Sequence, residues 1–131
     1  MREVVLDASI IGRWFGPAAD PPSARWRSDF EAGQLDITVP ALLFLELVNV
    51  ASRRWRWTED RLLTLVRRLE DSRFVILDPP LDRIATWAAR GLTAYDATYV
   101  ALAEGRGVPL ITHDREMVAL APDIARPVSD R

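Results

Sequence analysis

The chain has 131 residues, a formal net charge of −2 at pH 7, one histidine and no cysteine. This length predicts one domain, residues 1–131, and the residue counts exclude disulfides, cysteine-ligated metal sites and multi-histidine centres. All 17 basic residues are arginine, which excludes mechanisms that need a lysine, and the net charge predicts no overall attraction to nucleic acid.

Short apolar runs alternate with helical patterns along the chain. The elements predicted first are a strand at Glu3–Leu6, helices at 8–15 and 20–32, a strand at Ile37–Val39, and helices at 40–54 and 58–71. Those that follow are a strand at Phe74–Leu77, helices at 81–90 and 93–105, a strand at Val108–Ile111, a helix at 114–120 and a strand at Ile124–Val128. Pro127 cannot donate a ladder hydrogen bond, so we expect this last strand at an edge of the sheet.

This alternation predicts the fold class. Short, continuously apolar strands are typical of a parallel sheet that is covered on both faces. We therefore expect an α/β protein, a three-layer α/β/α sandwich with a parallel sheet of four or five strands. Ligand sites in open parallel sheets lie beyond the carboxyl ends of the strands. Asp7 and Asp114 follow two of these strands and should lie at that edge.

Four acidic residues are candidates for one shared site: Asp7, Glu46, Asp96 and Asp114. Three of them have ordinary structural alternatives. Asp7 could cap the turn after its strand, and Asp114 could be the N-cap of the last helix. Thr93 and Asp96 match the spacing of a capping box.

Glu46 has fewer alternatives. Its neighbours within the helix at 40–54 are almost all apolar, which predicts a helix buried on every side. A surface position is therefore not expected, and the alternative to a site role is an ion pair with Arg53 two turns later. Asn49, three residues after Glu46, should lie on the same helix face.

A shared metal ion accounts for all four acids at once, because converging carboxylates repel each other until a cation joins them. Oxygen ligands without a histidine or cysteine set predict Mg²⁺ or Mn²⁺ rather than zinc. Ser9, Asn49 and Thr112 are candidates for hydrogen bonds to the ligands.

These residues make the chain resemble a PIN-domain ribonuclease of the VapC toxin type over nearly its whole length. The matching pieces are V-V-L-D-A-S, Pro40 with Glu46-x-x-Asn49, Y-D-A-T-Y-V-A-L-A-E-G-R-G-V-P-L-I-T, and T-H-D. The resemblance implies a divalent-metal-dependent endoribonuclease, usually homodimeric and held inactive by a cognate antitoxin. It also implies that the catalytic and metal-binding residues are Asp7, Glu46, Asp96 and Asp114. The role of the last acid varies within the family, and this chain has Met117 where a further acid would help.

The predicted chemistry is hydrolysis of RNA by an activated water. One metal ion, or two about 4 Å apart, would bind the phosphate and lower the pKa of that water. The carboxylates serve mainly as ligands, and Asp96 or Asp114 orients the water or accepts its proton.

The segment 53–57 is the strongest basic and aromatic cluster. Arg53, Arg54 and Arg56 could contact RNA phosphates, with Trp55 and Trp57 stacking on bases. The alternative is a helix end whose tryptophans pack in the core or in a dimer interface. The remaining tryptophans are expected in the core, a dimer interface or an antitoxin groove: Trp14, Trp26 and Trp87.

Two other functions fit parts of this pattern. A phosphoryl-transfer signalling domain also places acids at strand ends, but it uses a lysine that this chain lacks. A degenerate PIN fold could act as a non-catalytic binding module, although all four acids are present. No apolar run could span a bilayer and no signal-peptide pattern opens the chain, so we expect a cytoplasmic protein with no membrane partner.

Overall fold

The computed structural model describes residues 2–129; residues 1, 130 and 131, which the predicted domain included, lie outside the described part. Within the described range, five parallel strands form one sheet in the order β3-β2-β1-β4-β5. The strands are β1 (Arg2–Leu6), β2 (Leu35–Val39), β3 (Val75–Ile76), β4 (Leu110–Thr112) and β5 (Ala125–Pro127). The predicted parallel sheet is confirmed, and β5 with its Pro127 lies at an edge as expected.

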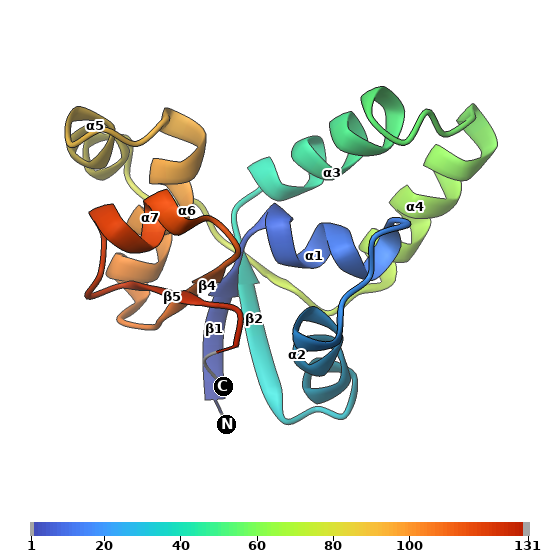
Figure 1. The fold of residues 1–131 in the computed structure, drawn as a ribbon, viewed down its shortest axis with the longest axis horizontal. Helices are drawn as coiled ribbons and strands as arrows, with labels where there is room; N and C mark the ends of the chain where they lie inside the picture. Colours follow the sequence, from blue (N-terminus) through green and yellow to red (C-terminus); the bar gives the residue numbers. More distant parts are fainter. Residues whose placement is uncertain (1, 130–131) are drawn as a thin grey trace.

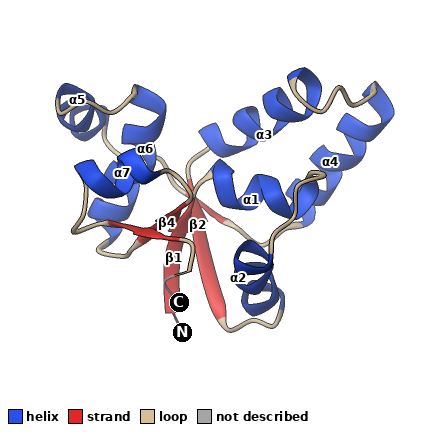
Figure 2. Ribbon diagram, viewed as in Figure 1, coloured by secondary structure: helices blue, strands red, loops and turns tan. Residues whose placement is uncertain are grey.

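Seven helices flank this sheet in residues 2–129. They are α1 (Ala8–Phe15), α2 (Pro21–Glu31), α3 (Leu42–Arg53), α4 (Glu59–Asp71), α5 (Leu81–Ala89), α6 (Ala94–Arg106) and α7 (Arg115–Leu120). Helices α1 to α4 lie on one side of the sheet and α5 to α7 on the other (Figures 1 and 2). The predicted three-layer sandwich is therefore confirmed, and each helix boundary falls within about two residues of its predicted position.

Local chemistry explains where the helices begin and end. The Thr58 hydroxyl caps α4 by accepting the Arg61 N–H at 3.4 Å. Gly107 ends α6 with φ 67°, a left-handed conformation that favours glycine. Such caps act over a few residues, which is why the sequence predicts them well.

Strand β1 forms the centre of the core and sets the register of the site. Val4, Val5 and Leu6 are fully buried, and Leu6 pairs with Ile111 of β4. The residues after that pair are Asp7 and Thr112. The parallel register therefore places these two polar side chains next to each other at the carboxyl edge.

Two burial predictions are wrong. Helix α3 is not enclosed: only Leu43, Leu47 and Ala51 are buried, while Leu45 is 71% exposed. Helix α3 packs mainly against α1 and α4, and the exposure of Leu45 shows that its opposite face is open to solvent. Strand β3 is also shorter than predicted, and both of its residues are exposed, Val75 at 41% and Ile76 at 54%.

Candidate active site

The carboxyl ends of the central strands meet where α1, α3 and α7 begin (Figure 1). Asp7 is the N-cap of α1, and Asp114 is the N-cap of α7. Asp96 lies in the first turn of α6, and Glu46 in the second turn of α3. The four predicted acids therefore come from four different elements.

Asp7 is the most deeply placed of these acids, at 5% exposure. Its Oδ1 accepts hydrogen bonds from the Ser9 backbone N–H at 3.1 Å and from the Ser9 hydroxyl. Its Oδ2 accepts a hydrogen bond from the Thr112 hydroxyl at 2.6 Å. Because a carboxylate offers about four lone-pair sites, these three donors leave it one further bond to make.

The two hydroxyls are themselves oriented by backbone groups of the β4–α7 loop. The His113 N–H donates to Ser9 Oγ at 3.0 Å, and the Asp114 N–H donates to Thr112 Oγ1 at 2.9 Å. Each hydroxyl accepts a backbone proton and so directs its own proton at Asp7. The sequence pointed to both hydroxyls as candidates for this role, and both hydrogen-bond to Asp7.

Burial raises the pKa of Asp7 to about 6, and the charge of Asp96 adds to this effect. The hydrogen bonds from Ser9 and Thr112 act in the opposite direction and favour the carboxylate. Asp7 is thus ionised at pH 7, but its charge has a substantial free-energy cost that a cation would relieve.

Glu46 is half-buried, and its Oε1 accepts a hydrogen bond from the Tyr99 hydroxyl. Burial raises the pKa of Glu46, and the charge of Asp96 raises it further. Tyr99 is 1% exposed and lies three residues after Asp96 on α6. The sequence analysis missed its role, although this spacing placed Tyr99 on the same helix face as Asp96.

Asp96 is half-buried, and its backbone N–H donates to the Thr93 hydroxyl at 3.1 Å. Burial raises the pKa of Asp96, followed by the charges of Asp114 and Glu116. Oδ1 of Asp114 is committed to its cap, accepting the N–H groups of Glu116 and Met117. Glu116 is a further acid near the site that the sequence analysis missed, one position before Met117.

The four acids differ in their partners from three other half-buried acids, Glu3, Asp20 and Glu104. Glu3, Asp20, Glu31 and Glu104 each form an ion pair with an arginine. Within residues 2–129, no ion pair includes Asp7, Glu46, Asp96 or Asp114. The predicted alternative for Glu46, an ion pair with Arg53, is therefore not formed.

These acids fit a hard divalent cation by donor type and by charge, because all supply oxygen and their mutual repulsion is uncompensated. The described residues contain no group of three or more acidic or histidine side chains close enough to form a ready ligand set. The structure thus brings the acids into electrostatic contact without closing a coordination shell.

A pocket of about 380 Å³ opens beside Glu46, between α1 and α3. Ser9, Asn49 and Arg54 line it, whereas Arg53 and Arg56 do not. Trp55 also lines this pocket, and its ring lies against Gly16, where an added Cβ would come within 2.2 Å of it. The alternative of tryptophans packed on the core is confirmed, since Trp55 and Trp57 both contact it.

Comparison with known proteins identifies the fold family. A family model described as the PIN domain matches residues 4–121. The chain belongs to the PIN domain family. The resemblance drawn from the sequence motifs is thereby confirmed at the level of that family.

A curated relative covers part of this PIN domain. Exonuclease VapC9 from Pyrobaculum aerophilum is 52% identical over 46 residues, which are 34% of this chain and 35% of that protein. The alignment spans only about a third of either protein. Its name alone therefore does not establish the activity of the whole chain.

Solved structures match the PIN domain over nearly its whole length. PAE2754 from Pyrobaculum aerophilum is 30% identical with a TM-score of 0.72, covering 97% of this chain and 90% of that chain. DNA-bound VapBC from Salmonella typhimurium is 17% identical with a TM-score of 0.72, covering 98% and 99%. VapC20 from Mycobacterium tuberculosis, described as a toxin that cleaves the sarcin–ricin loop, is 14% identical with a TM-score of 0.66, covering 88% and 93%. The last two show a shared fold. Among residues 2–129, no helix combines the length and apolar character needed to cross a membrane.

Proposed function

We propose that this protein is a divalent-metal-dependent endoribonuclease that acts as the toxin of a toxin–antitoxin pair. The observation that carries the proposal is the set Asp7, Glu46, Asp96 and Asp114: buried or half-buried acids at one sheet edge with no arginine partner. The names of the relatives support it, since they include an exonuclease, a VapBC complex and an RNA-cleaving toxin.

The chain's own residues have distinct tasks in this reaction. Asp7 and Glu46 are held as ligands, because Ser9, Thr112 and Tyr99 fix their carboxylates in place. Asp96 orients the attacking water and accepts its proton, a role that suits a carboxylate whose pKa is raised by burial and by Asp114. Water then attacks phosphorus in line, and the ribose oxygen on the opposite side departs.

Asp7 and Glu46 would supply oxygen ligands to Mg²⁺ or Mn²⁺, because these ions prefer hard oxygen donors. The described residues do not form a ready set of three ligands before the ion binds. When bound, such an ion supplies positive charge that stabilises the phosphate oxygens and activates water. Calorimetry tests this role independently of activity: Asp7→Asn should weaken Mn²⁺ binding at least tenfold. Unchanged binding would mean that the ion lies elsewhere.

Circular RNA distinguishes an endonuclease from an exonuclease, because it has no ends. The purified chain with Mg²⁺ or Mn²⁺ should linearise a circular RNA, and Asp7→Asn should not. A matched control is Asp82→Asn, which removes an exposed acid from α5. Cleavage of linear RNA alone would indicate an exonuclease. No cleavage of circular or linear RNA in a total-RNA preparation would favour the non-catalytic binding module.

The partners follow from the same assignment. The cognate antitoxin would be a protein that binds this chain and suppresses cleavage. A second copy of the chain would cover the outer face of α3, where Phe44 and Val48 line an apolar pocket of about 330 Å³ together with Ile76 of β3. Leu45 beside this pocket is the most exposed large apolar side chain of α3. A homodimer would remove this surface from water.

A further inference from the structure

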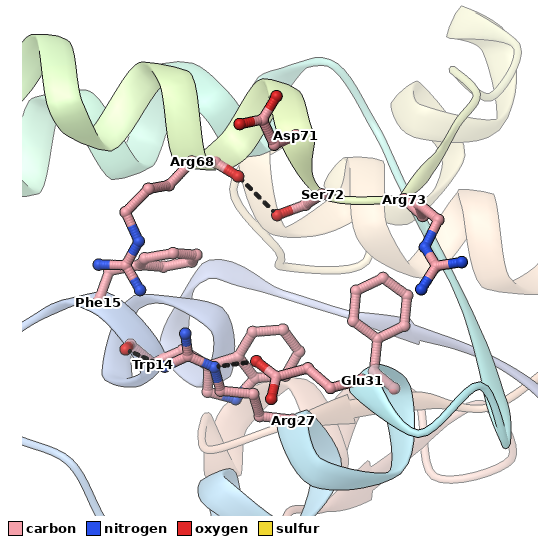
Figure 3. Close-up of a pocket in the computed structure, with 9 residues that line it drawn as sticks. Trp14, Phe15, Arg27, Glu31, Arg68, Asp71, Ser72 and Arg73 are labelled. Atoms are coloured by element: carbon pink, nitrogen blue, oxygen red, sulfur yellow. Dashed lines mark hydrogen bonds and ion pairs between the residues drawn. The ribbon is translucent and has the colours of Figure 1, made fainter.

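An arginine-rich groove runs across α1, α2 and α4, away from the four acids. We define the arginine groove by Phe15, Arg27, Trp57, Arg61, Arg68 and Arg73. It consists of two pockets of about 320 and 330 Å³ that share Phe15 and Arg68. Figure 3 shows Arg68 and Arg73 pointing into it from above, and Arg27 reaching it from α2.

Aromatic rings hold three of these arginines in place. The Arg68 and Arg27 guanidinium carbons lie 4.8 and 5.4 Å from the Phe15 ring centre. That of Arg61 lies 4.2 Å from the Trp57 ring centre. A guanidinium group that is already positioned loses less conformational freedom when it binds a phosphate. The groove is therefore prepared for an anionic ligand.

The charges of the groove are only partly neutralised. Arg27 forms an ion pair with Glu31 at 2.8 Å. In the described residues, no ion pair includes Arg61, Arg68 or Arg73. Four arginines and three acids, Glu31, Asp60 and Asp71, line the two pockets, so the groove has a small excess of positive charge in a chain whose net charge is −2. Local charge of this kind attracts phosphates in spite of the overall balance.

The groove is a neighbour of the pocket beside the acids: Trp57 lines the groove and Trp55 lines that pocket. The Trp57 ring centre lies 5.1 Å from that of Trp55. Trp55 lines the pocket that also contains Ser9 and Glu46. Along α1, the eight residues from Asp7 to Phe15 span about 12 Å at about 1.5 Å per residue. A stacked strand covers that length with three or four nucleotides at about 3.4 Å each.

We propose that the arginine groove binds the single-stranded RNA that flanks the cleaved bond, three or four nucleotides away from it. This inference rests on the proposed ribonuclease function and adds a substrate-binding site to it. Arginines bind the phosphates, and the guanidinium planes that lie on Phe15 and Trp57 provide surfaces for unpaired bases. The groove and the pocket beside the acids are linked by the neighbouring rings of Trp57 and Trp55. This proximity favours the substrate over a separate ligand, because one strand of three or four nucleotides is long enough to reach both.

Binding is measured by fluorescence anisotropy with a labelled 12-nucleotide oligouridylate in EDTA, so that no cleavage occurs. Arg61→Gln combined with Arg68→Gln should weaken binding about tenfold. The loss of two phosphate contacts should also change how binding depends on salt. The slope of log K plotted against log salt concentration should become less steep by about 1.4, because each contact on a single strand contributes about 0.7. Both arginines are exposed, and circular dichroism verifies that the variant is folded.

The matched control combines Arg67→Gln with Arg90→Gln. Arg67 lies on α4 but does not line the groove, and Arg90 lies 4.5 Å from the Trp87 ring centre at the end of α5. These two substitutions remove the same charge and one arginine–ring contact, but outside the groove. The RNA affinity of this control variant should therefore stay near that of the wild type. Equal losses in the two double variants would overturn the inference, because they would indicate net charge alone.

A cleavage assay separates failure of the groove from failure of the proposed function. An RNA of 16 nucleotides around a mapped cleavage site is compared with the same RNA trimmed to two nucleotides on either side. The wild type should cleave the long RNA faster than the trimmed RNA. In the groove variant, the ratio of these two cleavage rates should be about tenfold smaller. A wild type that cuts neither RNA contradicts the ribonuclease function, while the oligouridylate assay still tests the groove. If the variant keeps its RNA affinity but escapes the antitoxin, the groove is a protein-binding site and the inference is overturned.

Discussion

Helices α3 and α6 each carry one acid of the candidate site, but in opposite surroundings. Helix α6 packs against β1, β4 and α5, and its residues from Tyr99 to Ala103 are all buried. Helix α3 has larger apolar side chains, yet Leu45 is 71% exposed. The small residues of α6 allow neighbouring elements to pack closely around it. The apolar surface of α3 is larger, and α1 and α4 cover only part of it.

This difference separates two uses of apolar sequence. On α6, the apolar residues are buried and fix the helix within the fold, and this fixes the position of Asp96. On α3, the apolar residues stabilise one face of the helix and leave Leu45 exposed on the other. The hydrogen bond from Tyr99 to Glu46 then ties the acid of the exposed helix to the buried one. The Glu46 carboxylate is therefore oriented from α6, while α3 itself is held by its buried face against α1 and α4.

The largest expected effect is on catalysis. Asp96→Asn should reduce RNA cleavage by roughly 10²–10³-fold, the range found when a preorganised polar group is removed from an active site. Tyr99→Phe should cost less, roughly tenfold, because Glu46 keeps its charge and loses only its orienting hydrogen bond. Single-turnover cleavage rates measure both. Equal rates for Tyr99→Phe and wild type would show that α3 holds Glu46 without help from α6.

Stability should separate the two faces of α3. Leu47→Ala should lower the free energy of unfolding by about 2–5 kcal/mol, because Leu47 is 1% exposed and its removal leaves a cavity. Leu45→Ala should change it by less than about 0.5 kcal/mol in the monomer. Urea unfolding at low protein concentration measures both values. Similar losses would mean that the outer face of α3 is covered within one chain.

The pH dependence tests the cost of burying Asp7. Its folded pKa of about 6 lies above the ordinary value of 3.8, so the folded chain binds a proton more tightly than the unfolded chain between these values. The metal-free protein should therefore lose stability as the pH rises from 4 to 6 and lose no more above that. The loss should be roughly 3 kcal/mol at about 1.4 kcal/mol per pKa unit.

Asp7→Asn removes this titration and serves as the reference. Urea unfolding in EDTA at pH 4, 5, 6 and 7 should show a difference between the two proteins that grows with pH. Carboxylates that do not interact with Asp7 titrate alike in both proteins and cancel in that difference, whereas Asp96, which interacts with Asp7, contributes to it. A difference that does not vary with pH would mean that the Ser9 and Thr112 hydroxyls fully offset the burial of the charge.

The smallest expected effect concerns the homodimer. Leu45→Glu should raise the dimer dissociation constant at least tenfold, about 1.4 kcal/mol, because it places a charge in an apolar interface. Leu63→Glu on α4 is the matched control, since Leu63 is also an exposed leucine at 46%. Sedimentation equilibrium measures both constants. A larger effect of Leu63→Glu would place the interface on α4 instead.

The sequence by itself determined the order of the elements, the parallel sheet and the position of Asp7 and Asp114 at its carboxyl edge. These features depend on periodicity and caps, which act between residues close in the chain. It also offered Ser9 and Thr112 as candidate hydrogen-bonding partners, and the parallel register of β1 and β4 in the structure brings Thr112 next to Asp7.

Only the tertiary structure decided which side of α3 is covered, which hydroxyl orients Glu46, and where the arginines gather. The apolar sequence of α3 predicted a helix buried on every side. The sequence shows which residues are apolar, but it does not show how many helices and strands pack against them. The contact between Tyr99 and Glu46 spans 53 positions, and the arginine groove joins α1, α2 and α4. Such contacts depend on packing between distant segments, which no local pattern specifies.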